Sequence, residues 1–111
     1  MEIKSKIWLE ENGELAFGTG KFAILKAVGE TGSINKAAKS LNMSYRHAWS
    51  YIRSAEKRLG QELLIKNKGG RDGGGAILTD YALNLLGKFE RLEEAVKVFT
   101  NKRFKEIFSH D

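Results

Sequence analysis

The stretch that decides the fold is TGSINKAAKSLNMSYRHAWSYIRSAEKRL, residues 31–59. It reads as two helices separated by a tight turn at Asn42, a residue that tolerates the left-handed backbone such turns require. The first helix carries Ala37 and Ala38, the small side chains that two closely crossing helices need at their contact. The pattern therefore predicts a helix-turn-helix over residues 33–59.

The second helix of this unit has two different faces. Ser44 is a good N-cap at its start, and apolar residues then recur on one side, at Ala48, Ile52, Ala55 and Leu59. The opposite side is basic, aromatic and rich in hydrogen-bonding groups: Tyr45, Arg46, His47, Ser50 and Arg53. The DNA major groove accepts such a face on the second helix of a helix-turn-helix. An ordinary hairpin of an all-α protein is the competing interpretation.

Positive charge is concentrated in the same part of the chain. The net charge is +5, yet residues 33–75 hold nine basic and three acidic residues, and the remainder is slightly acidic. This asymmetry is typical of a polyanion-binding surface. The residues we predict to contact DNA are Ser44, Tyr45, Arg46, His47, Ser50, Arg53, Lys36, Lys57, Lys68 and Arg71. Arg46 is the best candidate to read guanine, and Arg53, Lys57 and Lys36 are better placed for phosphates.

Composition narrows the remaining classes of function. A chain of 111 residues without cysteine predicts one domain, residues 1–111, with no disulfide and no thiolate metal site. Neither a signal peptide nor a membrane span is recognisable, so we expect a cytoplasmic protein with no membrane partner. The histidines are His47 and His110, and neither has a paired nucleophile or a ligand cluster. We therefore expect no enzyme, catalytic residue, metal or cofactor.

The N-terminal third predicts a hairpin followed by a helix. Residues 3–9 alternate between apolar and polar positions, as in a half-buried strand. Asn12-Gly13 is a two-residue turn signal, so a β-hairpin is expected over 3–17. A helix is expected over 19–30.

A second hairpin is predicted over residues 63–78, with KNKGGRDGGG between its arms. A hairpin directly after a recognition helix would be the wing of a winged helix, and its glycines would allow close backbone approach to DNA. A phosphate-binding P-loop would need the ending GK[ST] before a helix, which is absent. A plain surface loop is the remaining alternative.

A long helix is predicted over residues 79–108, capped by Thr79. Its apolar residues follow a heptad-like seam, from which we predict a dimer interface of Leu85, Phe89, Leu92, Val96 and Phe99. Such a helix would be ~45 Å long at ~1.5 Å per residue, which is longer than so small a domain covers. Pairing of two such helices in a homodimer would explain the extra length. The alternative is that the helix folds back onto its own domain.

Two motifs carry a resemblance to a known family. ETGSINKAAKSLNMSYRHAWSYI and GGRDGGGAILT, followed by a long helix, resemble the N-terminal domain of ModE-type molybdate-responsive regulators, within the broader LysR-type winged helices. The similarity covers about residues 7 to 100. It implies that Ser44, Tyr45 and Arg46 face the major groove and that Lys68 and Arg71 meet the backbone or minor groove. Trp49 would pack on the apolar side of its helix.

The resemblance has one departure. Regulators of that type continue into molybdate-binding domains, whereas this sequence ends at Asp111. We therefore expect no molybdate pocket here. The two alternatives are that the chain acts without a ligand and that a separate protein supplies the effector-sensing function. The fold class expected is mostly α with small β: a winged helix-turn-helix with an N-terminal hairpin and a long C-terminal dimerisation helix.

Three functions follow in decreasing order of support. The first is a homodimeric, sequence-specific transcriptional regulator on a pseudo-palindromic operator. The second is a nonspecific architectural DNA-binding protein, which would share the basic surface but prefer no sequence. The third is a protein-interaction adaptor, which the concentration of positive charge disfavours.

Overall fold

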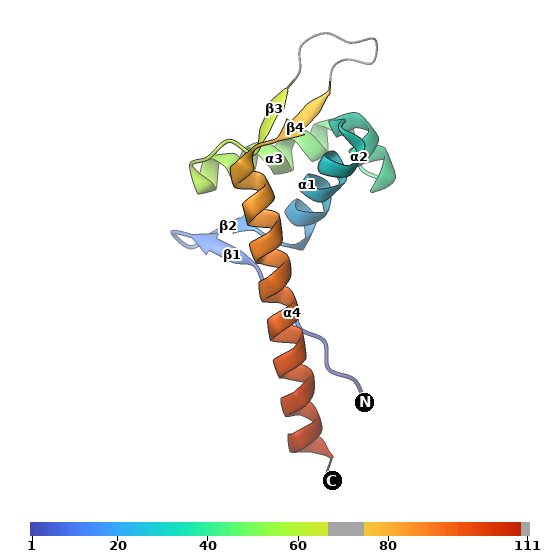
Figure 1. Ribbon diagram of the computed structural model, residues 1–111, viewed down its shortest axis with the longest axis vertical. Coiled ribbons are helices and arrows are strands. Elements are labelled where there is room, and N and C mark those ends of the chain that lie inside the picture. Colours follow the sequence, from blue (N-terminus) through green and yellow to red (C-terminus); the bar gives the residue numbers. More distant parts are fainter. Residues whose placement is uncertain (67–74, 110–111) are drawn as a thin grey trace.

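The computed structural model describes residues 1–66 and 75–109. Its elements, in chain order, are β1 (Leu9–Glu11), β2 (Glu14–Phe17), α1 (Thr19–Thr31), α2 (Ile34–Ser40), α3 (Tyr45–Leu59), β3 (Leu64–Lys66), β4 (Ala76–Leu78) and α4 (Asp80–Phe108). Two antiparallel hairpins, β1-β2 and β3-β4, flank the three helices α1 to α3, and α4 leads away from them (Figure 1). The predicted winged helix-turn-helix class is confirmed.

The helix ends form where the sequence predicts them. The Ser33 hydroxyl accepts a hydrogen bond from the Lys36 N–H, and the Ser44 and Thr79 hydroxyls cap α3 and α4 in the same way. Asn42 has φ of 56°, so the turn between α2 and α3 uses the left-handed backbone expected. Gly60 ends α3 in the same conformation, which a glycine adopts without steric cost.

The core joins the helix-turn-helix to the start of α4. Ala37 and Ala38 are completely buried where α2 meets its neighbours, as their small size predicted. The Phe89 ring of α4 packs edge-on against Phe17, with 5.2 Å between centroids, and lies 5.5 Å from Phe22. These contacts fix the direction in which α4 leaves the body.

The first hairpin is shorter than expected. Asn12 and Gly13 both have positive φ, as a tight hairpin turn requires, but β1 begins at Leu9 rather than at residue 3. Leu9 pairs with Phe17, the last residue of β2. Among the described residues no strand pairs with residues 3–8, so their alternating pattern produces no ladder. The expectation of a hairpin over 3–17 was wrong in this part.

The molecule consists of a compact body and an extension. The body contains α1 to α3, both hairpins and the first turns of α4, and the extension is the rest of α4 with the N-terminal segment. The molecule measures 62 × 29 × 21 Å, and the long dimension follows α4, which continues well past the body with residues 1–8 beside it (Figure 1). Ile3 and Ile7 of that N-terminal segment are half-buried. No helix within the described residues combines the length and the apolar character needed to cross a membrane.

Candidate nucleic-acid interface

Helix α3 buries one side and exposes a basic side. Ala48, Ile52 and Ala55 are at most 1% exposed, which fixes the rotation of the helix. Each residue turns an α-helix by about 100°, so the side opposite this buried stripe is also fixed. The predicted residues Arg46, His47, Ser50, Arg53 and Lys57 are all exposed. We call Arg46, Ser50, Arg53 and Lys57 the basic face; they lie on the side opposite the core.

An aromatic and cationic cluster lies at one edge of the basic face. The Lys66 ammonium donates a hydrogen bond of 3.1 Å to the Tyr45 hydroxyl and lies 4.5 Å from the Trp49 ring centroid. The Arg53 guanidinium lies 5.5 Å from the same ring. Because Lys66 belongs to β3, these cation–π contacts fasten the second hairpin to the start of α3. Trp49 is half-buried and packs against the core, in line with the structural role expected for it.

The other predicted DNA contacts occupy different positions. Ser44 is at the start of α3, where its hydroxyl already accepts the His47 N–H. Lys36 is exposed on α2. Lys68 and Arg71 lie outside the described residues, and their predicted roles remain predictions from the sequence.

Two lysines, Lys66 and Lys21, were not among the predicted site residues, although the spacing of each from a buried residue indicates which way its side chain points. Lys66 lies two residues after the buried Leu64, so both side chains are on the same side of β3, the side that meets α3. Lys21 precedes Leu25 and Val28 by four and seven residues, so it shares the buried stripe of α1 and is only 8% exposed. Because lysine side chains are charged, both residues would ordinarily be expected on the solvent-exposed surface.

The predicted dimer seam of α4 needs one correction. Phe89 is 2% exposed and belongs to the core of its own domain, so it cannot also contact a partner. Leu85 and Val96 are half-buried, whereas Leu92 and Phe99 are 47% and 65% exposed. The heptad pattern correctly marked apolar residues, but the first turns of the stripe are covered by the body itself.

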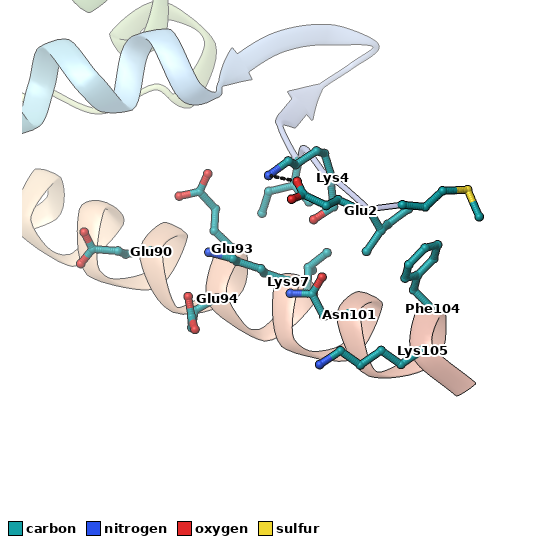
Figure 2. A pocket seen from close by; sticks show the side chains of 14 residues that line it. Glu2, Lys4, Glu90, Glu93, Glu94, Lys97, Asn101, Phe104 and Lys105 are labelled. Atoms are coloured by element: carbon teal, nitrogen blue, oxygen red, sulfur yellow. Dashed lines mark ion pairs between the residues drawn. The ribbon is translucent and has the colours of Figure 1, made fainter. Parts of the chain in front are cut away.

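A large groove lies away from the basic face. It separates the N-terminal segment from α4, with a volume of about 750 Å³, and carboxylates and amines of both elements line it (Figure 2). Glu90, Glu93 and Glu94 line its α4 side, together with Lys97 and Lys105. Within residues 1–66 and 75–109, no three histidine or acidic side chains gather closely enough to hold a metal ion.

Comparison with known proteins gives a consistent result. Residues 20–83 match the model of the bacterial regulatory helix-turn-helix proteins of the lysR family. The transcriptional regulator ModE of Haemophilus influenzae is 43% identical over 70 residues, which are 63% of this chain and 28% of that protein. The DNA-binding transcriptional dual regulator ModE of Escherichia coli K12 is 32% identical over 94 residues, 85% of this chain and 36% of that protein. The chain therefore spans about a third of the length of these relatives.

A solved structure agrees in fold. The protein of a CbnR DBD–DNA complex superimposes with a TM-score of 0.62 at 24% identity, over 79% of this chain and 95% of that one. At that identity the likeness supports the winged-helix architecture alone.

Proposed function

Because the chain belongs to the lysR family of bacterial regulatory helix-turn-helix proteins, we propose that it is a sequence-specific DNA-binding regulator of transcription. The observation that carries the proposal is the basic face of α3, whose rotation is fixed by three buried residues behind it. In this role α3 enters the major groove and the β3-β4 hairpin lies over the adjacent backbone. The two curated relatives compared above are also named as transcriptional regulators.

The residues divide by the kind of contact they would make. Arg46 lies near the start of α3 on the basic face, where a guanidinium can form two hydrogen bonds to one guanine. Arg53, held over Trp49, and Lys57 lie farther along and suit phosphates. Lys36 on α2 suits the backbone as well. A regulator of this kind would act in the cytoplasm, and an effector-sensing partner could act on it.

We also propose that it binds as a homodimer through α4. Leu92 and Phe99, seven residues apart, present an exposed apolar stripe that the body does not cover. Two copies paired along this stripe would present two copies of α3 to the same duplex. A pseudo-palindromic operator with half-sites about one helical turn apart follows from that symmetry.

The test is selection of bound duplexes from random DNA at moderate salt, using the full chain. An enriched inverted repeat supports a dimeric operator-binding regulator. Tight binding without enrichment would replace the proposal with an architectural protein. Absence of binding would favour the adaptor.

The variant Arg46→Ala then tests whether α3 recognises the base sequence. We expect a loss of about 1–3 kcal/mol on the selected duplex and relaxed preference at a single base pair, because one bidentate contact is removed. Lys57→Ala is the control on the same face, and it should weaken all sequences about equally. Equal weakening by Arg46→Ala would show that Arg46 contacts only the backbone.

A further inference from the structure

A groove beside α3 contains the ammonium group of Lys21, a residue that is only 8% exposed and that has no carboxylate partner among the described residues. The groove has a volume of about 590 Å³ and runs between the first turn of α1 and α3; its lining includes Lys6, Thr19, Lys21, Ser50, Tyr51 and Ser54. We call it the flank groove. Lys21 Nζ donates to the Leu15 carbonyl and to Ser54 Oγ, both at 3.3 Å. Neither acceptor is charged, and the ion pairs found among residues 1–66 and 75–109 do not include Lys21.

The surroundings of Lys21 disfavour its charge. Burial lowers the pKa of the Lys21 ammonium, and the nearby Arg58 guanidinium lowers it further. An ammonium has three donors, so two hydrogen bonds leave one N–H for a further acceptor. An anion in the flank groove would supply that acceptor and offset both the burial and the repulsion.

The start of α1 adds to the positive potential of the groove. Gly18 is the N-cap and provides no side-chain cap, and the first turn contains no acidic residue. The N–H groups and the positive end of the helix dipole therefore suit an anion. Gly20 allows this turn to approach α3 closely, because a Cβ there would lie only 3.0 Å from Tyr51 Cε2. Thr19 and Gly20 line the same groove as Lys21.

The flank groove adjoins the basic face. Ser50 belongs to that face and also lines the groove, and Ser54 follows one turn later. The cluster of Tyr45, Trp49 and Lys66 lies on the other side of α3. A helix in the major groove lies between two sugar-phosphate backbones, so each side of α3 would adjoin one of them.

We propose that the flank groove binds one backbone phosphate of the DNA, on the strand opposite the one that β3 approaches. The ligands would be Lys21 Nζ, the Lys6 ammonium and the N–H groups at the start of α1. The inference rests on the proposed DNA binding and extends it to residues outside the helix-turn-helix. It makes α1 a positioning element that fixes the angle of α3 from the side away from the hairpin.

Two variants separate phosphate binding from folding. Thr19→Asp places a carboxylate at the start of α1, which favours the helix but repels a phosphate. Lys21→Met removes the ammonium and keeps an unbranched chain in the buried position. Ser109→Asp is the control that makes the same charge change as Thr19→Asp, and it lies ~30 Å beyond Phe89 along α4 at ~1.5 Å per residue.

The readout is the salt dependence of binding to the duplex selected above. We expect the slope of log affinity against log salt to fall by about one unit for Thr19→Asp and Lys21→Met. Affinity at fixed salt should fall about three- to tenfold, with base preference unchanged. Ser109→Asp should match the wild type, and unfolding curves should show all variants folded.

A series of duplexes with single methylphosphonates locates the contact. At one position, removal of the phosphate charge should weaken binding by the wild type more than binding by Lys21→Met, which has already lost one of the proposed ligands. Full additivity at every position, or an unchanged salt slope in both variants, would overturn the flank-groove contact while leaving DNA binding established. A wild type that binds no DNA would overturn the proposed function, and this inference with it.

Discussion

The two halves of α4 carry the same kind of apolar pattern but have opposite surroundings. In the first half, Ala82 and Phe89 are fully buried against α1 and the hairpins, and the helix is part of the body. In the second half, Leu92 and Phe99 are exposed, and of the residues that the structure describes only the N-terminal segment lies beside the helix (Figure 1). A periodic apolar stripe thus indicates that something covers the helix without saying whether the cover is the same chain or a second one.

The largest expected effect comes from the buried half. Phe89→Ala should lower the free energy of unfolding by about 3–5 kcal/mol, because the cavity would open between two aromatic neighbours. Urea unfolding measures this directly. The matched change Phe99→Ala, on the exposed half, should cost less than about 0.5 kcal/mol in the monomer. Similar losses for both would remove the distinction between the halves.

The second prediction concerns the exposed half. Phe99→Asp should raise the dimer dissociation constant at least tenfold, about 1.4 kcal/mol, because a charge would be placed in the paired stripe. Sedimentation or light scattering over a concentration series checks it. Val98→Asp is the control: Val98 is 57% exposed but points about 100° away. If both variants behave alike, the partner does not cover the Leu92–Phe99 stripe.

The third prediction uses pH to probe the interior of the body. The folded-state pKa of Lys21 lies below the ordinary value of 10.5. At pH values between the folded-state pKa and 10.5, the unfolded chain binds more protons than the folded chain. The contribution of Lys21 to stability therefore rises with pH. The slope is at most about 1.4 kcal/mol per pH unit. The unfolding free energy of the wild type minus that of Lys21→Met should therefore rise toward pH 10. A difference that does not change with pH would contradict the burial of the charge.

The smallest effect is expected at the junction of the two halves. Lys26 of α1 lies 3.3 Å from the Glu90 carboxylate of α4, and both side chains are more than half exposed. Such pairs contribute about 0.2–1 kcal/mol, so Glu90→Gln should lower stability by no more than that. The loss should shrink at high salt. Glu94→Gln, one turn farther on, removes the same charge but keeps the Lys26 contact; an equal loss there would mean that the pair itself contributes nothing.

Most of the fold could be predicted because its signals are local. Ser33, Ser44 and Thr79 cap helices through hydrogen bonds to residues three positions later, so their roles are visible in any short window. The Asn12-Gly13 turn is equally local. The strand expected from residue 3 failed because strand formation depends on a partner, and β2 extends only from Glu14 to Phe17.

The candidate site was predictable only in part, for the same reason. The buried stripe of α3 determines its opposite face, so Arg46, Ser50 and Arg53 could be placed from periodicity alone. The contact of Lys66 with Tyr45 joins residues 21 positions apart, and that of Lys21 with Ser54 joins residues 33 apart. No local pattern encodes such separations. Both lysines therefore became visible only once the chain was folded.

The sequence by itself determined the helix boundaries, the turn at Asn42, the rotation of α3 and the positive charge of its exposed face. These features depend on backbone preferences and side-chain periodicity over a few turns. Only the tertiary structure decided that Phe89 is buried in the body, that Phe99 is left exposed by its own chain and that Lys21 is mostly buried. Those outcomes depend on which distant surfaces meet, and burial is a property of the assembled surfaces rather than of any one segment.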